Sequence, residues 1–154
     1  MSLVWENRQT MLFQIQEMLR VEHIRNEDAI RHEIDTYNDL VPGPNELKAT
    51  LYIEYEDKDE RALMLSRFRT LPGSVYLDIG ERSYKAAFKQ QDGEEDDRLP
   101  AVNYLRFGLD PQSRSALAAA ETKVALRVTH PNYAQTAILS DDSKKALSHD
   151  LLQE

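Results

Sequence analysis

The stretch Lys48-Ala49-Thr50-Leu51-Tyr52-Ile53-Glu54-Tyr55 decides the fold, because the spacing of the apolar residues changes here from helical to extended. Ala49, Leu51, Ile53 and Tyr55 alternate with neighbours that are mostly polar. Alternation with a period of two is typical of a β-strand that buries one face and exposes the other. The stretch therefore predicts a strand with one wet face.

Residues 7–41 precede this strand and have the periodicity of a helical hairpin. Apolar residues of the first helix share one face, given about 100° per residue; they are Met11, Leu12, Ile15, Met18 and Leu19. Asn26, which Glu27 and Asp28 follow, is typical of the N-cap of a second helix. The sequence Pro42-Gly43-Pro44 then ends that helix.

After the hairpin, one order of elements is predicted twice: strand, helix, strand, strand. The first unit, residues 47–89, has its expected helix over 58–71 and its later strands over 75–79 and 84–88. The second unit, residues 102–140, has expected strands over 102–107, 124–128 and 133–139 and a helix over 111–120. A C-terminal helix is expected over 141–154.

Short matches between the two units indicate a tandem β-α-β-β repeat. Tyr52-Ile53-Glu54-Tyr55 matches Tyr104-Leu105-Arg106-Phe107 at an offset of 52 residues. Val75-Tyr76-Leu77 matches Val124-Ala125-Leu126 at an offset of 49 residues. Tyr84 is the first residue of its expected strand, as Tyr133 is of its own. Chance similarity between short strands rich in Tyr, Val and Leu is the alternative, and the sequence leaves it open.

These patterns predict a single α+β domain over residues 1–154. Six strands with one buried face need a cover, and the helical hairpin can supply it. We therefore expect the hairpin to pack on a six-stranded, mainly antiparallel sheet or barrel built from the tandem repeat, with the C-terminal helix following. Residues 1–3 are compatible with a vector-derived leader and carry no weight in this prediction.

The composition excludes several classes of site. The 154-residue chain has no cysteine, so it can form no disulfide, Cys-ligated zinc site, iron–sulfur centre or thiol nucleophile. Its net charge of −8 argues against nucleic acid and anionic membranes as partners. Five acids and one arginine between Asp92 and Arg98 contribute half of that charge, in a predicted solvated loop. Without a signal peptide or an apolar run near the ~20 residues that span a bilayer, we expect a cytoplasmic protein.

No strong catalytic motif is present, so the informative residues are polar ones at positions that periodicity assigns to apolar faces. Glu22 and His23 lie near the end of the first helix, and Glu33 lies on the second. Carboxylates and a histidine on facing helices can hold a metal, but the adjacent Glu22 and His23 point about 100° apart. We expect ion pairs with arginines such as Arg20 or Arg31, and neither a metal site nor a cofactor.

A site between the hairpin and the sheet is one functional hypothesis. His130, in the turn His130-Pro131-Asn132-Tyr133, is either a presented acid/base group or an ordinary turn histidine. Arg106 and Arg127 lie on predicted strands, where an arginine holds an anionic group or simply covers a wet face. Such a site would bind a small anion or a metal, in a binding protein or an enzyme. Its candidate lining is Glu17, Arg20, Glu33, Tyr37, Arg106, His130 and Tyr133.

Four stretches are distinctive in their order along the chain: Glu6-Asn7-Arg8 together with residues 13–20, residues 33–44, residues 103–107 and residues 130–133. Together they resemble a family of uncharacterised bacterial proteins, classed as a domain of unknown function. Genes of that family often lie beside those of a rubrerythrin and of an iron–sulfur protein similar to heterodisulfide reductase. Family members begin with a further basic segment, so a site or interface that this segment supplies is expected to be incomplete here.

The resemblance implies an accessory or interaction protein of a redox or peroxide-defence system, with a rubrerythrin-like or iron–sulfur protein as its partner. It implies no catalytic residues, and a chain without cysteine cannot carry a cysteine-bound redox centre itself. A further hypothesis is a homo-oligomer. Phe13, Val21 and Ile24 lie off the main apolar stripe of the first helix, so the sheet or another subunit must cover them.

Overall fold

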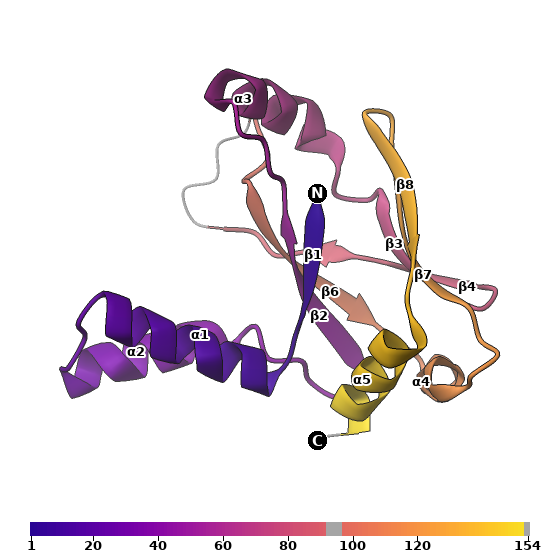
Figure 1. Cartoon of the computed structure of the whole chain (residues 1–154), viewed down its shortest axis with the longest axis horizontal. Coiled ribbons are helices and arrows are strands. Elements are labelled where there is room, and N and C mark those ends of the chain that lie inside the picture. Colours follow the sequence, from indigo (N-terminus) through magenta and orange to yellow (C-terminus); the bar gives the residue numbers. More distant parts are fainter. Residues whose placement is uncertain (92–96, 153–154) are drawn as a thin grey trace.

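The computed structural model describes residues 1–91 and 97–152 and has a mixed α+β architecture, as predicted. These residues form five α-helices and two four-stranded antiparallel sheets, neither of which closes into a barrel (Figure 1). The first sheet has the strand order β1-β2-β6-β5, and the second has the order β4-β3-β7-β8. In the described part of the chain, no helix is both long enough and apolar enough to cross a membrane.

Helices α1 (Arg8–Val21) and α2 (Glu27–Asn38) form the predicted hairpin. Asn7 begins α1 with a capping box: its side chain accepts a 2.8 Å hydrogen bond from the Thr10 N–H, while its own N–H donates to the Thr10 hydroxyl at 2.9 Å. Asn26 caps α2, as its position predicts, by accepting hydrogen bonds from two N–H groups of the first turn. These caps satisfy donors that a helix start leaves without partners.

The first sheet contains a strand that the sequence did not predict. Its members are β1 (Ser2–Glu6), β2 (Glu46–Tyr52), β6 (Val102–Gly108) and β5 (Ala87–Phe88). The interpretation of residues 1–3 as a leader overlooked β1, in which Ser2 and Leu3 pair with Tyr52 and Leu51. Leu3, Val4 and Trp5 are consecutive apolar residues, so β1 shows no alternation that periodicity could detect.

The second sheet contains β3 (Val75–Ile79), β4 (Arg82–Lys85), β7 (Val124–His130) and β8 (Tyr133–Ile138). Gly80, with φ of +61°, lies in the tight turn between the paired residues Ile79 and Arg82, where a left-handed backbone favours glycine. The remaining helices are α3 (Lys58–Arg67), the 3₁₀ turn η1 (Phe68–Thr70), α4 (Pro111–Ala118) and α5 (Asp141–Leu152). The predicted acidic loop lies outside the described residues over 92–96.

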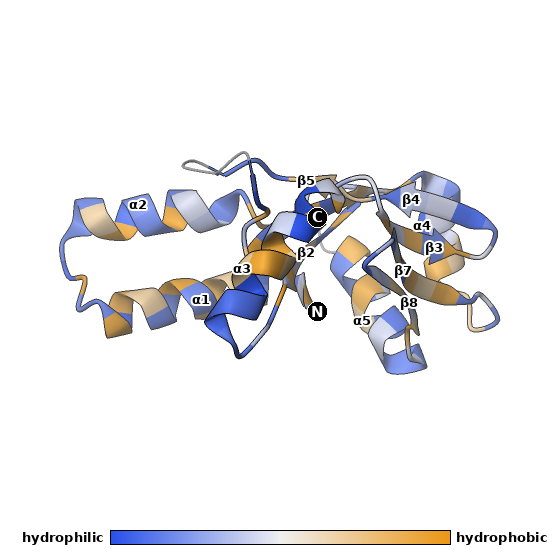
Figure 2. Cartoon of the chain, turned by 90° about the horizontal axis from the view of Figure 1, so that it is seen from above, coloured by the Kyte–Doolittle hydropathy of each residue, from blue (hydrophilic) through white to orange (hydrophobic). Residues whose placement is uncertain are grey.

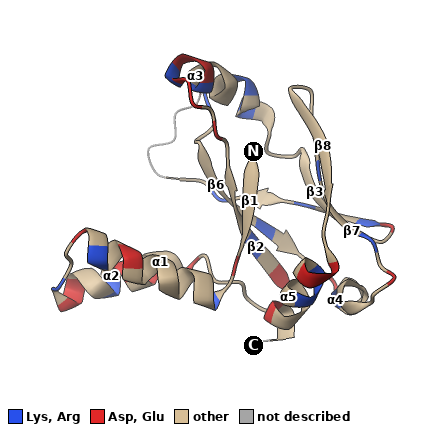
Figure 3. Cartoon of the chain, viewed as in Figure 1, with Lys and Arg blue, Asp and Glu red and all other residues tan. Residues whose placement is uncertain are grey.

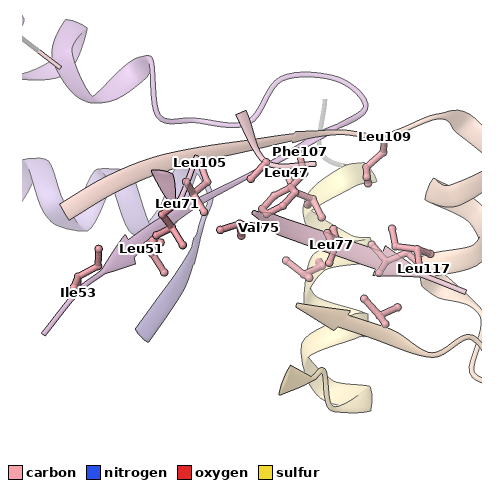
Figure 4. Close-up of a cluster of buried hydrophobic side chains, with 14 of the residues drawn as sticks. Leu47, Leu51, Ile53, Leu71, Val75, Leu77, Leu105, Phe107, Leu109 and Leu117 are labelled. Atoms are coloured by element: carbon pink, nitrogen blue, oxygen red, sulfur yellow. The ribbon is translucent and has the colours of Figure 1, made fainter. Parts of the chain in front are cut away.

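The hydrophobic core lies between the two sheets. Leu47 and Leu51 of β2 and Phe107 of β6 point inward from the first sheet, and Val75 and Leu77 of β3 point inward from the second (Figure 4). Residues of α3, η1, α4 and α5 complete this cluster; they include Leu65, Phe68, Leu117, Leu147 and Leu151. Because one face of each sheet is buried in this way, the other face of the first sheet is left for polar residues.

The prediction of one six-stranded sheet was wrong. The segment predicted as a single strand over 84–88 divides at Ala86, which is buried and donates its N–H to Val75 at 2.9 Å. Before Ala86 the chain pairs as β4 in the second sheet, and after it the chain pairs as β5 in the first. Local alternation cannot reveal this change of sheet, because both short strands carry the same period of two.

The prediction that the hairpin covers the sheet was also wrong. Figures 1 and 2 show that α1 and α2 project away from the two sheets and join them only at their base. α1 buries Met11 and Ile15, and α2 buries no residue. The second sheet already covers the inner face of the first, so the hairpin has no sheet face left to cover.

The order β2-α3-β3-β4 recurs as β6-α4-β7-β8, which is the order that the repeat hypothesis predicts. Corresponding strands also pair with each other: β2 with β6 and β3 with β7, both antiparallel. Tyr84 and Tyr133 are not equivalent, because Tyr84 pairs with Leu77 within its strand whereas Tyr133 pairs with His130 beside the turn. A duplication as the origin of the two units stays a prediction.

Candidate functional site

A groove on the outer face of the first sheet, at the base of the hairpin, is the candidate site. Its volume of about 410 Å³ lies within the range of small-molecule pockets. Residues from β2, β6 and β5 form its floor, and the end of β1 and the segment after α2 form its sides. The lining residues are Glu6, Asp39, Leu40, Lys48, Ala49, Thr50, Ala87, Phe88, Lys89, Tyr104, Leu105 and Arg106. We call this feature the groove.

Strand register places the charged side chains of the groove in one row. Lys48 of β2 pairs with Glu6 of β1 on one side and with Arg106 of β6 on the other. Residues directly opposite each other in an antiparallel pair point to the same face, so all three side chains rise from the outer face. Thr50 and Tyr104 form the next pair on this face.

Glu6 forms the acidic end of the groove. Its side chain is only 8% exposed, and its Oε1 accepts a 2.8 Å hydrogen bond from the hydroxyl of Thr50. Its Oε2 accepts a 2.5 Å hydrogen bond from the hydroxyl of Thr10 in the first turn of α1. The capping box and this buried carboxylate therefore fix the base of the hairpin against the first sheet.

Three cations form the basic end of the groove. Lys48 Nζ donates a 2.6 Å hydrogen bond to the carbonyl of Asp39. Lys89 lies 3.6 Å from the carboxylate of Asp39, and Arg106 lies 3.4 Å from that of Glu46. These two ion pairs are longer than the 2.7–2.9 Å that is typical of charge-assisted hydrogen bonds. Figure 3 shows basic and acidic positions close together where β2 and β6 run side by side.

Glu46 lies at the edge of the basic end and keeps its negative charge. Burial alone would raise its pKa, but the N–H of Gly43, at 2.7 Å, opposes this effect together with Lys48 and Arg106. The net result is a pKa of Glu46 below its ordinary value. Glu46 therefore acts as an internal counterion for the cations of the groove.

Tyr104, on the floor of the groove, keeps its phenolic proton. Burial is the largest cause that raises its pKa, and Tyr37, Tyr52 and Glu6 raise it further. The pKa of Tyr52 is raised by burial and then by Glu6 and Glu54. Neutral phenol groups are hydrogen-bond donors, so Tyr104 gives the floor of the groove a polar group without a charge.

The structure places one of the seven predicted site residues, Arg106, in the lining of the groove. Tyr37 is not among the lining residues, but it contributes to the raised pKa of Tyr104 on the floor. Glu17 and Arg20 instead form an exposed ion pair of 2.9 Å along α1. Glu33 lies half-buried on α2 within the projecting hairpin.

His130 and Tyr133 lie in the second sheet, at the β7–β8 turn. His130 is 2% exposed, and its Nδ1 accepts a 3.1 Å hydrogen bond from the N–H of Asn132. The neutral ring therefore carries its proton on Nε2 and donates it to the Thr70 hydroxyl at 3.0 Å. Phe68 packs edge-on to the ring, with 5.2 Å between centroids. These contacts are those of a turn histidine that fixes η1 to β7.

Sequence reasoning missed most of the groove. Lys48 and Thr50 carried a signal, since both occupy the polar positions of the strand that decides the fold. Glu6 carried none, because β1 was not predicted. Among residues 1–91 and 97–152, no group of three His, Asp or Glu side chains is arranged to hold a metal ion. The chemistry that the groove offers is recognition of a charged group by cations on rigid strands.

Comparisons with known proteins agree with the fold. The profile of a family described as "Protein of unknown function (DUF3501)" matches residues 1–151. The crystal structure of a novel protein of unknown function from Burkholderia pseudomallei K96243 is similar, with 35% sequence identity and a TM-score of 0.87. The match covers 97% of this chain and 78% of that chain. No curated protein matches the chain.

Proposed function

We propose that this chain, which belongs to the DUF3501 family, binds a small anionic molecule in the groove at the base of its helical hairpin. One observation carries the proposal: Lys48, Lys89 and Arg106 line the same cavity. Within the described residues, the ion pairs of two of these cations are long: Lys89 lies 3.6 Å from Asp39, and Arg106 lies 3.4 Å from Glu46. An anion that enters the groove would exchange these pairs for shorter charge-assisted hydrogen bonds.

The charge of the whole chain does not oppose this function. Half of the net −8 belongs to the segment from Asp92 to Arg98, and the groove itself has more cations than anions among its lining residues. The groove is therefore the region where we expect an anion to bind.

The experiment is a titration with inorganic phosphate and with acetate, followed by two-dimensional amide NMR. We expect shifts at amides of β2 and β6 and at residues 87–89. Arg106→Gln should weaken binding about tenfold, since a hydrogen bond between charged groups contributes about 1.5–3 kcal/mol. Arg127→Gln is the matched control, because Arg127 is paired with Asp78 at 2.7 Å on the second sheet. Absence of shifts at the groove with both anions, or equal effects of the two variants, would refute the proposal.

Self-association through the hairpin is a second candidate function. The hairpin exposes four apolar side chains to solvent: Leu12 (54%), Phe13 (63%), Val21 (58%) and Ile34 (38%). The ion pairs Glu17–Arg20 and Glu27–Arg31 lie within single helices, so neither needs a partner protein to complete it. A second copy of the chain, which presents the same apolar side chains, is the partner that we propose. Two paired hairpins would form a four-helix arrangement that buries both apolar stripes.

Light scattering of the purified chain tests this second candidate. We expect a dimer that the double substitution Leu12→Glu, Ile34→Glu converts to a monomer with an unchanged circular dichroism spectrum. Leu63→Glu is the control, since Leu63 is 51% exposed on α3, outside the hairpin. A wild-type monomer at high micromolar concentration would refute self-association. The redox partner that the resemblance implies is a separate expectation, and none of the matched proteins supports it.

A further inference from the structure

We infer that the groove selects a dipolar ligand, an aliphatic amino carboxylate whose carboxylate lies at Arg106 and whose ammonium lies at Glu6. The inference rests on the proposed function, which accounts only for the anionic end of the ligand. It adds the chemical group at the other end of the ligand, an ammonium, and the approximate length of the ligand.

The length follows from strand register. Glu6 and Arg106 lie in one row with Lys48 between them, on three adjacent strands. Neighbouring strands are about 4.8 Å apart, so the Cα atoms of Glu6 and Arg106 lie roughly 10 Å apart. A molecule that contacts both side chains must span a comparable distance. In an extended chain of five methylene groups, six bonds of roughly 1.2 Å extension each place the amine nitrogen about 7 Å from the carboxyl carbon, and the flexible side chains of Glu6 and Arg106 cover the remaining distance.

The carboxylate of Glu6, at the acidic end of the groove, can accept a further hydrogen bond from a ligand. A carboxylate has about four acceptor positions, and Glu6 uses two of them for the hydroxyls of Thr10 and Thr50. Lys48, the cation in register with Glu6, directs its ammonium to Asp39 and Glu46 instead. A buried carboxylate is stabilised by a charged partner, and an ammonium group of a ligand would supply one.

The middle of the groove suits an uncharged chain. Leu40 and Phe88 line it together with Tyr104, whose ring lies on the same face as Arg106 and Glu6. The raised pKa of Tyr104 keeps its hydroxyl protonated, so no negative charge lies between the two ends. Lys48 lies between Glu6 and Arg106 in register, so the order along the groove is a carboxylate followed by two cations, with the neutral Tyr104 beside this row. A ligand with the complementary order is an amine, an aliphatic linker and a carboxylate.

Three probes test the inference on the wild-type chain: 6-aminohexanoate, hexanoate and hexylamine, each titrated with amide NMR as the readout. We expect 6-aminohexanoate to bind about tenfold more tightly than hexanoate, because a close charge pair adds at least that factor. Hexylamine should bind more weakly than either. Glu6→Gln should lower the ratio of 6-aminohexanoate affinity to hexanoate affinity towards one, and Glu54→Gln, at an exposed carboxylate, is the control that should keep the wild-type ratio.

The outcomes separate the two proposals. Equal affinity for 6-aminohexanoate and hexanoate would overturn this inference and leave the anion-binding proposal intact. A preference that survives Glu6→Gln would also overturn it. If neither 6-aminohexanoate nor hexanoate shifts the amide NMR signals of the groove residues, the proposed function fails and the inference fails with it. The comparison of probes on the wild-type chain decides the matter even if Glu6→Gln does not fold.

Discussion

The hydroxyl of Thr50 donates a 2.8 Å hydrogen bond to Oε1 of Glu6, and so joins the middle of β2 to the point where β1 passes into α1. Both residues are buried, at 3% and 8% exposure. The projecting hairpin has few contacts with the rest of the chain, so its orientation depends on such links at its base. The same hydrogen bond fixes the carboxylate that forms one end of the groove.

Thr50→Val should therefore destabilise the protein. Valine keeps the shape of threonine but removes the hydroxyl, which leaves one buried carboxylate oxygen without its donor. We expect the free energy of unfolding to fall by about 1–3 kcal/mol, measured by urea denaturation. Thr36→Val is the control, because the exposed Thr36 donates only to its own helix, at the carbonyl of His32. Equal losses in both variants would contradict this role of Thr50.

Lys144→Met should weaken the contact between α4 and α5 and so destabilise the protein. The ammonium of Lys144 is nearly buried and donates to the carbonyls of Ala119, Ala120 and Thr122 at 3.0, 3.2 and 2.6 Å. Methionine retains the aliphatic volume but leaves carbonyls beyond the C-terminus of α4 unsatisfied. We expect a loss of about 2 kcal/mol in unfolding free energy.

Lys145→Met is the matched control for this prediction, since its side chain is exposed on the same helix. It should change the unfolding free energy by less than about 0.5 kcal/mol. Faster amide exchange around Thr122 in the Lys144 variant would locate the effect. A Lys144 variant as stable as the control would show that water replaces the ammonium at no cost.

Asp110 should make the stability of the protein depend on acidic pH. The hydroxyl of Tyr84, the N–H of Ser113 and the guanidinium of Arg82 lower its pKa from 3.8 to about 2. Because the folded pKa lies below the unfolded one, the stabilisation is complete above about pH 5 and is lost as the pH falls from about 4 to 2. Thermal unfolding at several pH values measures this loss.

Asp110→Asn removes the negative charge of Asp110 and keeps an N-cap for α4, since asparagine is also a good N-cap. The difference in melting temperature between wild type and variant should be largest near neutral pH and should vanish near pH 2. A difference that stays constant across this range would mean that the shifted pKa of Asp110 does not contribute to folding.

His130→Leu should change stability without changing the groove. Leucine fills most of the volume but leaves the Thr70 hydroxyl and the Asn132 N–H without their partner. We expect a loss of about 1–3 kcal/mol in urea unfolding. Phosphate titration of the groove should give the wild-type affinity. Weaker phosphate binding in a folded His130→Leu variant would instead link the turn histidine to the ligand site.

In the described residues, sequence periodicity found the five α-helices and five of the eight strands as separate elements, because their apolar residues follow the helical or the strand period. It did not find β1, whose apolar residues are consecutive, and it joined β4 and β5 across Ala86. Of the residues that line the groove, it selected Arg106. The polar alternation at Lys48 and Thr50 was visible, but an exposed face and a groove floor have the same pattern.

The sequence by itself determined the α+β class, the cap at Asn26, and the absence of any cysteine chemistry. These features depend on neighbours within a few residues, and local propensity is sufficient to define them. Only the tertiary structure decided that two sheets enclose the core, that the hairpin projects, and that Glu6, Lys48 and Arg106 share one row. That row depends on strand register between residues up to 100 positions apart in the chain, which no local pattern encodes.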